Sequence, residues 1–313
     1  EYRQAMAATI DRLEQEQGLA GVIFASAKKV FFAGGDLNEL LAAEKGKEAQ
    51  FMDMLRVTKH NLRRLEKLPV PVVAAINGAA LGGGFEICLC CNHRIAWDDK
   101  SVQLGLPEVS LGLLPGGGGV VRMVNLLGLE KALPYLLEGK KVAPQAALAE
   151  GMIHETVATV AELVPRAKAW ILANKDSEEV AVQPWDRKGF RLPGGNVSSP
   201  KIAQMVAGAP AMLRQKTRGL LPAPEKILDC AVEAARGCLR GVSAADVRSL
   251  YFATTAPPYV EKLNASTIHA ASGLPAAVRA LDLACSVRAG MGALLAAHDA
   301  AGAGRGVSLA TLS

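Results

Sequence analysis

The chain has 313 residues, half of them apolar and about a fifth charged, and its formal charge is +5. This composition indicates a folded protein with one large or two smaller domains, and it excludes disorder as the default state. No run of Lys and Arg is long enough to predict a nucleic-acid groove or a polybasic anchor, and aromatic residues are too scarce for base stacking. No apolar stretch is long enough to predict a membrane span.

The N-terminal segment has no basic region followed by an apolar one, so the sequence predicts no secretion signal. Six cysteines are few for this length, and free thiols in a reducing, cytoplasmic location are the expected state. Three of them, Cys88, Cys90 and Cys91, precede His93, but no second ligand pair follows at zinc spacing. These thiols are therefore expected in the core, and no metal is expected.

Helices and strands alternate along the first 174 residues. Apolar residues at spacings of three and four predict helices at 1–17, 48–67, 83–91, after 119, and at 129–138, 144–150 and 160–174. Short apolar runs predict strands within 18–27, 71–76, 94–97, 101–105 and 153–158, and a capping-box pattern at 36–39 predicts a further short helix. The alternation predicts an α/β fold in which helices cover parallel strands.

The rest of the chain divides into three segments. Residues 175–200 contain several Pro and Gly residues and are interpreted as a linker, and 201–262 are interpreted as a helical extension of the domain at 1–174. Residues 263–313 form a tail rich in Ala and Gly with few bulky apolar residues. Its Gly290 and Gly292 are followed by Leu295 where a dinucleotide fingerprint needs a third glycine, which disfavours a nicotinamide dehydrogenase.

Residues 77–119 contain the chemistry-bearing groups. Gly82, Gly83 and Gly84 stand at a strand-to-helix junction, where free N–H groups of a helix N-terminus bind a ligand oxygen; a tight turn against a neighbouring backbone is the alternative. Glu86 follows in the first helical turn, where the helix dipole also favours a carboxylate. Glu108 follows in GLPEVSLG. Two such glutamates can hold one water between them, as base and acid, if burial raises a pKa.

A second glycine-containing loop, FFAGGD at 31–36, offers further backbone N–H groups. Two converging N–H donors are what an enolate or tetrahedral oxyanion needs. Asp36 is interpreted as a helix cap rather than a catalyst. The run PGGGG at 115–119 lacks the GK[ST] of a phosphate loop, so it is interpreted as a turn.

The segments FFAGGDL, NGAALGGGFE and QLGLPEVSLGLLPGGGG resemble the signatures of the enoyl-CoA hydratase/isomerase (crotonase) family. The resemblance implies a spiral of ββα turns that binds an acyl-CoA thioester, with its carbonyl oxygen between the N–H groups of Ala33 and Gly83. It implies that Glu86 and Glu108 activate water for addition to a trans-2-enoyl-CoA. The other substrate-binding positions it implies are Gly34, Gly35, Asp36, Gly82, Gly84, Pro107 and Gly116. No cofactor is expected, since coenzyme A enters with the substrate.

With VQLGLPEVSLGLLPGGGGVVRMV and QPWDRKGFRLPGG, residues 1–255 resemble the hydratase half of the multifunctional fatty-acid oxidation branch of this family. That similarity implies a role in β-oxidation, a homo-oligomer and a thiolase partner. The branch's opening strands and its 3-hydroxyacyl-CoA dehydrogenase domain have no counterpart in the sequence. Two alternatives therefore stay open beside a hydratase: an enoyl-CoA isomerase, and a non-catalytic fragment or subunit.

Overall fold

The computed structural model describes residues 2–35, 46–197 and 199–236, and three strands at 247–254, 279–284 and 307–312. The chain divides into two units, 1–236 and 237–313. The first unit contains a four-stranded parallel sheet with the strand order β1-β2-β4-β7. These strands are β1 (Val22–Ala25), β2 (Val72–Ile76), β4 (His93–Trp97) and β7 (Glu155–Val157). The parallel sheet expected from the alternation is therefore present.

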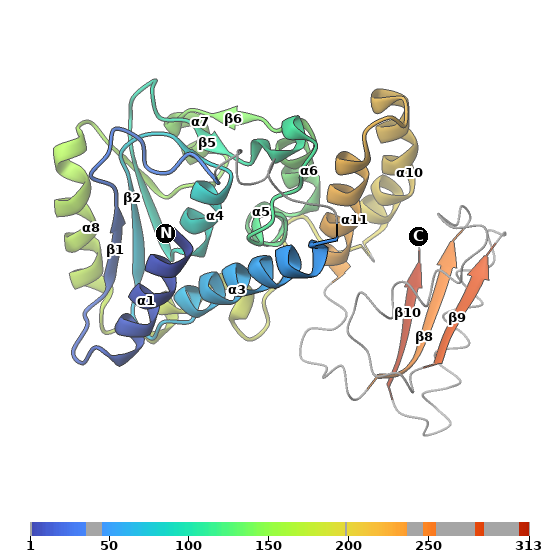
Figure 1. Cartoon of the computed structure of the whole chain (residues 1–313), viewed down its shortest axis with the longest axis horizontal. Helices are drawn as coiled ribbons and strands as arrows, with labels where there is room; N and C mark the ends of the chain where they lie inside the picture. The colour runs from blue at the N-terminus through green and yellow to red at the C-terminus, as the bar shows by residue number, and fades with distance from the viewer. Residues whose placement is uncertain are drawn as a thin grey trace. The chain divides into compact units, whose positions relative to one another are not determined.

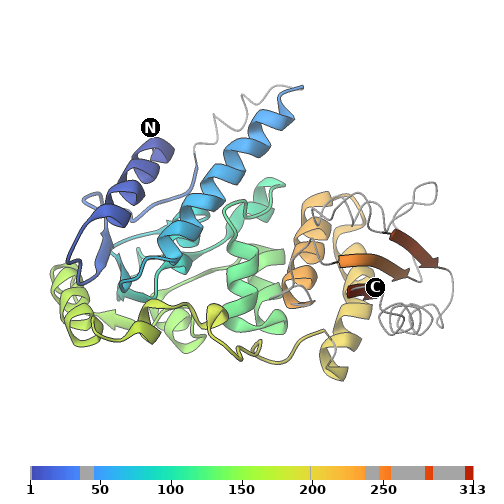
Figure 2. The same ribbon diagram turned by 90° about the horizontal axis from the view of Figure 1, so that it is seen from below.

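Helices cover both faces of this sheet (Figure 1). On one face lies α8 (Val160–Asn174), which packs against Val73 and Ala75 of β2. On the other face, also visible in Figure 2, lie α1 (Tyr2–Gln15), α3 (Glu48–Glu66) and α4 (Gly83–Cys90). All five residues of β2 are buried, which confirms the strand covered on both faces that its unbroken apolar run predicts.

A second, three-stranded sheet positions the turns around α4. Its middle strand β5 (Leu104–Gly105) pairs in parallel with β3 (Ala80–Leu81) and antiparallel with β6 (Lys141–Val142). The chain runs from β3 into α4 and from β5 into the 3-10 helix η1 (Pro107–Leu111). The helices that follow are α5 (Gly119–Leu127), α6 (Leu129–Glu138) and α7 (Pro144–Ala149). The bounds of α6 and α8 agree with their predicted ranges.

The predicted helical extension belongs to the same core as the sheet. The predicted linker at 175–200 contains α9 (Glu178–Ala181) and the 3-10 turn η2 (Pro184–Asp186), and two helices follow, α10 (Pro200–Thr217) and α11 (Pro222–Arg236). Buried Ile202, Ile227 and Leu228 join the main hydrophobic cluster, and both helices lie beside α6. The predicted boundaries at 174 and 200 therefore fall inside one compact unit.

The second unit corrects the prediction for 201–262. It contains a parallel sheet with the order β10-β8-β9, formed by β8 (Val247–Thr254), β9 (Arg279–Ala284) and β10 (Val307–Leu312). The predicted helical segment thus contains a strand, because VRSLYFAT is rich in the β-branched and aromatic residues that favour strands. The tail at 263–313 contributes two strands. The positions Gly290, Gly292 and Leu295 lie outside the described residues.

Among the described helices, none combines the length and the apolar character that a membrane crossing requires.

Candidate active site

The segment around Ala33 and the turn that opens α4 lie against each other. Phe32 forms an isolated parallel bridge with Ala80, and its carbonyl oxygen accepts a hydrogen bond of 3.0 Å from the Leu81 amide. Ala33 and Gly83 follow closely after these paired residues, so the two predicted N–H donors stand on adjacent segments. Within the described ranges, neither amide forms a backbone hydrogen bond outside α4, and the first N–H groups of a helix have no partner inside it.

Two of the three consecutive glycines allow this close approach. A methyl group at Gly84 would collide with the carbonyl oxygen of Phe32. Gly82 has a φ of +55°, a conformation that favours glycine, and a methyl group there would lie 2.8 Å from Oε1 of Glu108. Gly82 and Gly84 therefore allow a tight turn against a neighbouring backbone, which was the alternative to ligand binding. Because they have no side chains, none covers the N-terminus of α4 at these positions. Gly34 lies at the same contact: a methyl group added to it would be 3.4 Å from the Leu81 carbonyl oxygen.

Glu86 is buried in the first turn of α4, with 4% of its surface exposed. Its Oε1 accepts a hydrogen bond of 2.7 Å from the Gly119 amide, and the Gly117 amide donates to the same carboxylate. Burial raises the pKa of Glu86, while these two N–H groups and the charges of Arg122 and Lys59 act to lower it. The loop before α5 thus supplies hydrogen bonds that stabilise the ionised form of this buried carboxylate.

Glu108 is the second residue of η1, and its carboxyl lies against Gly82 at the turn into α4. Its Oε2 is buried and has no hydrogen-bond partner among the described residues. Burial, and secondarily the charge of Glu86, raise the pKa of Glu108 to about 7. Both carboxyls therefore have a raised pKa, but Glu86 accepts backbone N–H groups that favour its ionised form, whereas Oε2 of Glu108 has no partner among the described residues.

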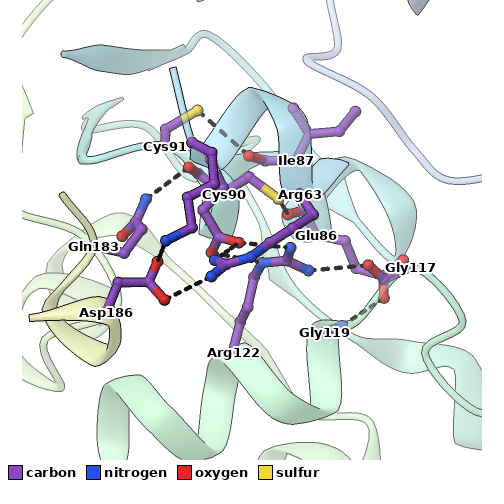
Figure 3. A network of polar contacts seen from close by, with 12 residues as sticks. Arg63, Glu86, Ile87, Cys90, Cys91, Gly117, Gly119, Arg122, Gln183 and Asp186 are labelled. Carbon is purple, nitrogen blue, oxygen red and sulfur yellow. Dashed lines mark hydrogen bonds and ion pairs between the residues drawn. The ribbon is translucent and has the colours of Figure 1, made fainter. Parts of the chain in front are cut away.

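A network of ion pairs, buried at Glu66 and Arg122 and partly exposed at Arg63, lies near Glu86 (Figure 3). Arg122 of α5 donates to both carboxylate oxygens of Glu66 on α3, at 3.0 and 3.1 Å, and to the Gly117 carbonyl oxygen at 3.0 Å. Arg63 donates to Glu66 and to Asp186 of η2, each at 2.6 Å. The network joins α3, α5 and η2 to the loop that holds Glu86.

The structure brings together most of the predicted site residues. Pro107 begins η1 and so places Glu108, and Gly116 lies beside Leu55 of α3 in the loop that leads to Gly117. Gly35 is exposed and has no neighbour within reach of a methyl group, and Asp36 with its predicted short helix lies outside the described residues. The residues that converge are Ala33, Gly34, Gly82, Gly83, Gly84, Glu86, Pro107, Glu108 and Gly116.

The remaining sequence candidates are structural. Cys88, Cys90 and Cys91 are buried free thiols, as predicted, and burial raises the pKa of each. His154 stacks on His93 with 4.6 Å between the ring centroids, and its Nδ1 accepts a hydrogen bond from the Arg94 backbone N–H. Within the described parts of the chain, no group of three or more His, Cys, Asp or Glu residues has a metal-binding arrangement.

A cavity of about 230 Å³ opens elsewhere, between α1 and α3. It is lined by Glu14, His60, Arg63, Arg64, Lys67, Leu68 and Pro69, none of which is a predicted site residue. Arg64 pairs with Asp11 and Glu14, and Arg63 pairs with Asp186 and Glu66. Its arginines are therefore already neutralised by partners.

Glu66 and Arg122 are residues of the site region that sequence reasoning missed. Arg122 is the single charged residue of α5, GVVRMVNLL, which otherwise reads as a buried apolar helix. A buried arginine needs an acidic partner, so a lone arginine in an apolar helix was the signal in the sequence that predicts a buried ion pair. Its partner Glu66 is 56 residues away and looks like an ordinary charged residue at the end of an amphipathic helix.

The sequence is similar to those of known proteins. Residues 1–183 match the family described as Enoyl-CoA hydratase/isomerase. The chain is 35% identical over 271 residues to the fatty acid oxidation complex subunit alpha of Shewanella amazonensis, a match that covers 82% of this chain and 37% of that protein. The chain thus spans little more than a third of the length of this relative.

Solved structures share the fold. An enoyl-CoA hydratase from Geobacillus kaustophilus has a TM-score of 0.52 and 30% identity, covering 56% of this chain and 65% of that one. An enoyl-CoA hydratase from Bacillus anthracis has a TM-score of 0.50 and 26% identity, covering 77% and 84%. The crotonase-like α/β fold expected from the sequence is therefore confirmed.

Proposed function

Because the chain belongs to the enoyl-CoA hydratase/isomerase family, we propose that it is an enoyl-CoA hydratase. In this proposal it adds water across the 2,3 double bond of trans-2-enoyl-CoA thioesters. The observation that supports it most is that buried Glu86 and partly buried Glu108 lie at the turn that opens α4, in different hydrogen-bond surroundings. An isomerase that moves one proton with one carboxyl has less use for the second.

The thioester carbonyl oxygen would accept hydrogen bonds from the amides of Ala33 and Gly83. Addition of water at C3 shifts the double-bond electrons toward this oxygen and forms an enolate. Two preorganised N–H donors stabilise that charge, and loss of one such donor costs about 3–4 kcal/mol of barrier. Coenzyme A arrives as part of the substrate, and the proposed reaction needs no further cofactor.

The two glutamates would divide the proton transfers. Glu86, whose ionised form the Gly117 and Gly119 amides favour, would take a proton from water as the water oxygen bonds to C3. Glu108, whose pKa is about 7, gives its proton to C2 of the enolate. The product carries the hydroxyl at C3 and the new hydrogen at C2, so one water has been added.

The test is hydration of crotonyl-CoA and of a longer 2-enoyl-CoA, followed by loss of the absorbance of the conjugated thioester. We expect Glu86→Gln and Glu108→Gln each to lower kcat by about 10²–10⁴-fold, the usual contribution of a general acid or base. Undiminished turnover in the double variant would reject the assignment. A 3-enoyl-CoA is supplied in parallel, and conversion to the conjugated isomer without hydration would favour the isomerase.

We propose fatty-acid β-oxidation as the setting of this reaction. Support comes from the name of the Shewanella relative, a subunit of a fatty acid oxidation complex. Turnover that rises with acyl chain length would agree with this setting. A thiolase partner and a homo-oligomer belong to the same proposal and are tested by co-purification and by light scattering.

A further inference from the structure

Arg122 occupies an unusual position between the ion-pair network and the loop that binds Glu86. It is 7% exposed, and it is hydrogen-bonded on one side to Glu66 and on the other to the Gly117 carbonyl oxygen. It also packs on Gly118, where a methyl group would overlap its Nη1. Figure 3 shows Arg122 reaching from α5 toward Gly117, and Glu86 lying beside Gly117 and Gly119.

We propose that Arg122 is a positioning residue for Glu86: anchored by Glu66, it fixes the glycine loop so that its amides point at the Glu86 carboxylate. The inference deepens the proposed function and rests on it for its catalytic meaning. Arg122 itself need not touch substrate.

A fixed anchor is needed because the loop has little conformational preference of its own. Residues 116–119 are four consecutive glycines, which lose more backbone entropy on ordering than any other residues. Arg122 removes part of that freedom by binding the Gly117 carbonyl oxygen, in the middle of the run. The amides of Gly117 and Gly119 on either side then stay directed at the carboxylate.

The anchor is itself held in place. Glu66 has 1% of its side chain exposed and receives both Arg122 and Arg63. Arg63 is in turn paired with Asp186, which also receives Lys67 at 3.3 Å. An arginine bound through a bidentate carboxylate has a defined orientation that a single ammonium contact does not give.

Direct charge is the competing explanation of the role of Arg122. The charged groups that act on Glu86 are Arg122 of α5, Lys59 of α3 and Glu108 of η1, with Glu66 partly neutralising Arg122. Among the influences that lower the pKa of Glu86, the two loop amides exceed the charge of Arg122. Orientation of the loop is therefore expected to outweigh the charge.

The experiment measures the ionisation of Glu86 without turnover. Full-length protein labelled with ¹³C at the glutamate δ-carbon is titrated by NMR, and Glu86→Gln assigns the signal. We expect Arg122→Met to raise the pKa of Glu86 by about one unit or more, because the carboxylate loses oriented donors while staying buried. Arg122→Lys should give a similar rise, since lysine keeps the charge but cannot bridge Glu66 and Gly117 in the same way.

The control is Arg94→Met. Arg94 is as deeply buried as Arg122, but it donates to the carbonyl oxygens of Met152 and Cys91 and has no contact with Glu86. It reports loss of stability alone and should leave the Glu86 titration unmoved. An unshifted titration in folded Arg122→Met overturns the proposal, and full restoration by Arg122→Lys overturns it in favour of charge alone. If Arg122→Met does not fold, Arg122→Lys and Glu66→Gln decide by the same criterion.

Kinetics provide the second readout. In Arg122→Lys the acidic limb of kcat/KM against pH should move upward with the Glu86 pKa, with KM nearly unchanged, because a positioning residue acts on the chemical step. A merely structural role would lower the amount of active enzyme without moving that limb. If the wild-type chain hydrates no enoyl-CoA, the proposed function fails, while the NMR titration still decides the role of Arg122.

Discussion

Glu86 and Glu108 are the same residue type within one site, and burial raises the pKa of both, yet their hydrogen-bond surroundings differ. Glu86 is deeply buried and receives two backbone N–H groups. Glu108 has a buried oxygen without a partner among the described residues, and a hydrogen bond from its own backbone offsets the cost of its charge only in part. The difference in local hydrogen bonding therefore supports Glu86 as the base and Glu108 as the acid in the proposed reaction, a division that the sequence spacing alone leaves open.

The raised pKa of Glu108 predicts a pH-dependent stability. With a pKa of about 7 in the folded chain against an ordinary value of 4.5, the folded state binds the proton more tightly, so stability falls as pH rises through this range. Glu108→Gln removes the ionisation. At about pH 8 it should raise the free energy of unfolding by up to about 3 kcal/mol, at roughly 1.4 kcal/mol per pKa unit, and near pH 4 the gain should vanish.

Urea unfolding of both proteins across this pH range measures the effect. Exposed Glu178→Gln is the control and should show no such pH dependence. If Glu108→Gln raised the free energy of unfolding equally at every pH, the pKa of Glu108 would not be raised in the folded chain.

Residues of the site differ in how far the sequence predicts them. Gly82, Gly84 and Glu86 stand in one short motif, whose glycines are needed for close backbone approach and whose Glu follows at fixed spacing. The partnership of Glu66 with Arg122 joins two helices far apart in the chain. No local pattern encodes such a contact, because it depends on how α3 packs beside α5.

At the scale of elements, the site depends on how closely α4 approaches the segment at Phe32. Gly84→Ala should push these segments apart, since the added methyl group would overlap the Phe32 carbonyl oxygen. Because Ala33 follows Phe32, the two proposed donors would separate. We expect kcat for enoyl-CoA hydration to fall by about 10²-fold or more, as when an oxyanion donor is lost.

The matched control is Gly208→Ala. Gly208 lies within α10, and a methyl group there meets no atom within 4 Å. This change should leave kcat unaltered and stabilise the chain by about 0.5–1 kcal/mol, the usual gain of alanine over glycine in a helix. Equal kcat in the two variants would mean that the α4 approach does not set the donor geometry.

Elements were predictable where their local pattern is strong. The amphipathic periods of α6 and α8 predict their bounds, and α8 begins with a complete capping box at Thr159 and Glu162. The strand β8 was missed because small and apolar residues around it also fit a helical period. Its pairing with β9 and β10 depends on segments far along the chain, which local periodicity does not report.

At the scale of the whole molecule, α10 and α11 are part of the fold that holds the site. Their apolar residues close the side of α5 and α6 that faces away from the sheet, as Figures 1 and 2 show. The sequence predicts these helices but not their packing, because the apolar face of a helix does not indicate which other part of the chain packs against it. A chain cut at the predicted domain boundary would therefore lose part of its core.

Two truncations test this dependence. A chain ending at Arg236 keeps the complete first unit, and we expect it to unfold cooperatively at the Tm of the full chain. Besides two buried alanines, a chain ending at Asn174 loses the five larger buried apolar side chains of the helical pair: Ile202, Leu213, Ile227, Leu228 and Val232. At about 1.5–3 kcal/mol each, their burial contributes on the order of 10 kcal/mol, comparable with the whole stability of a typical domain. We expect this shorter chain to lose its cooperative transition in circular dichroism and to bind a hydrophobic dye.

A sharp transition at an unchanged Tm in the chain ending at Asn174 would show instead that residues 1–174 form an independent domain.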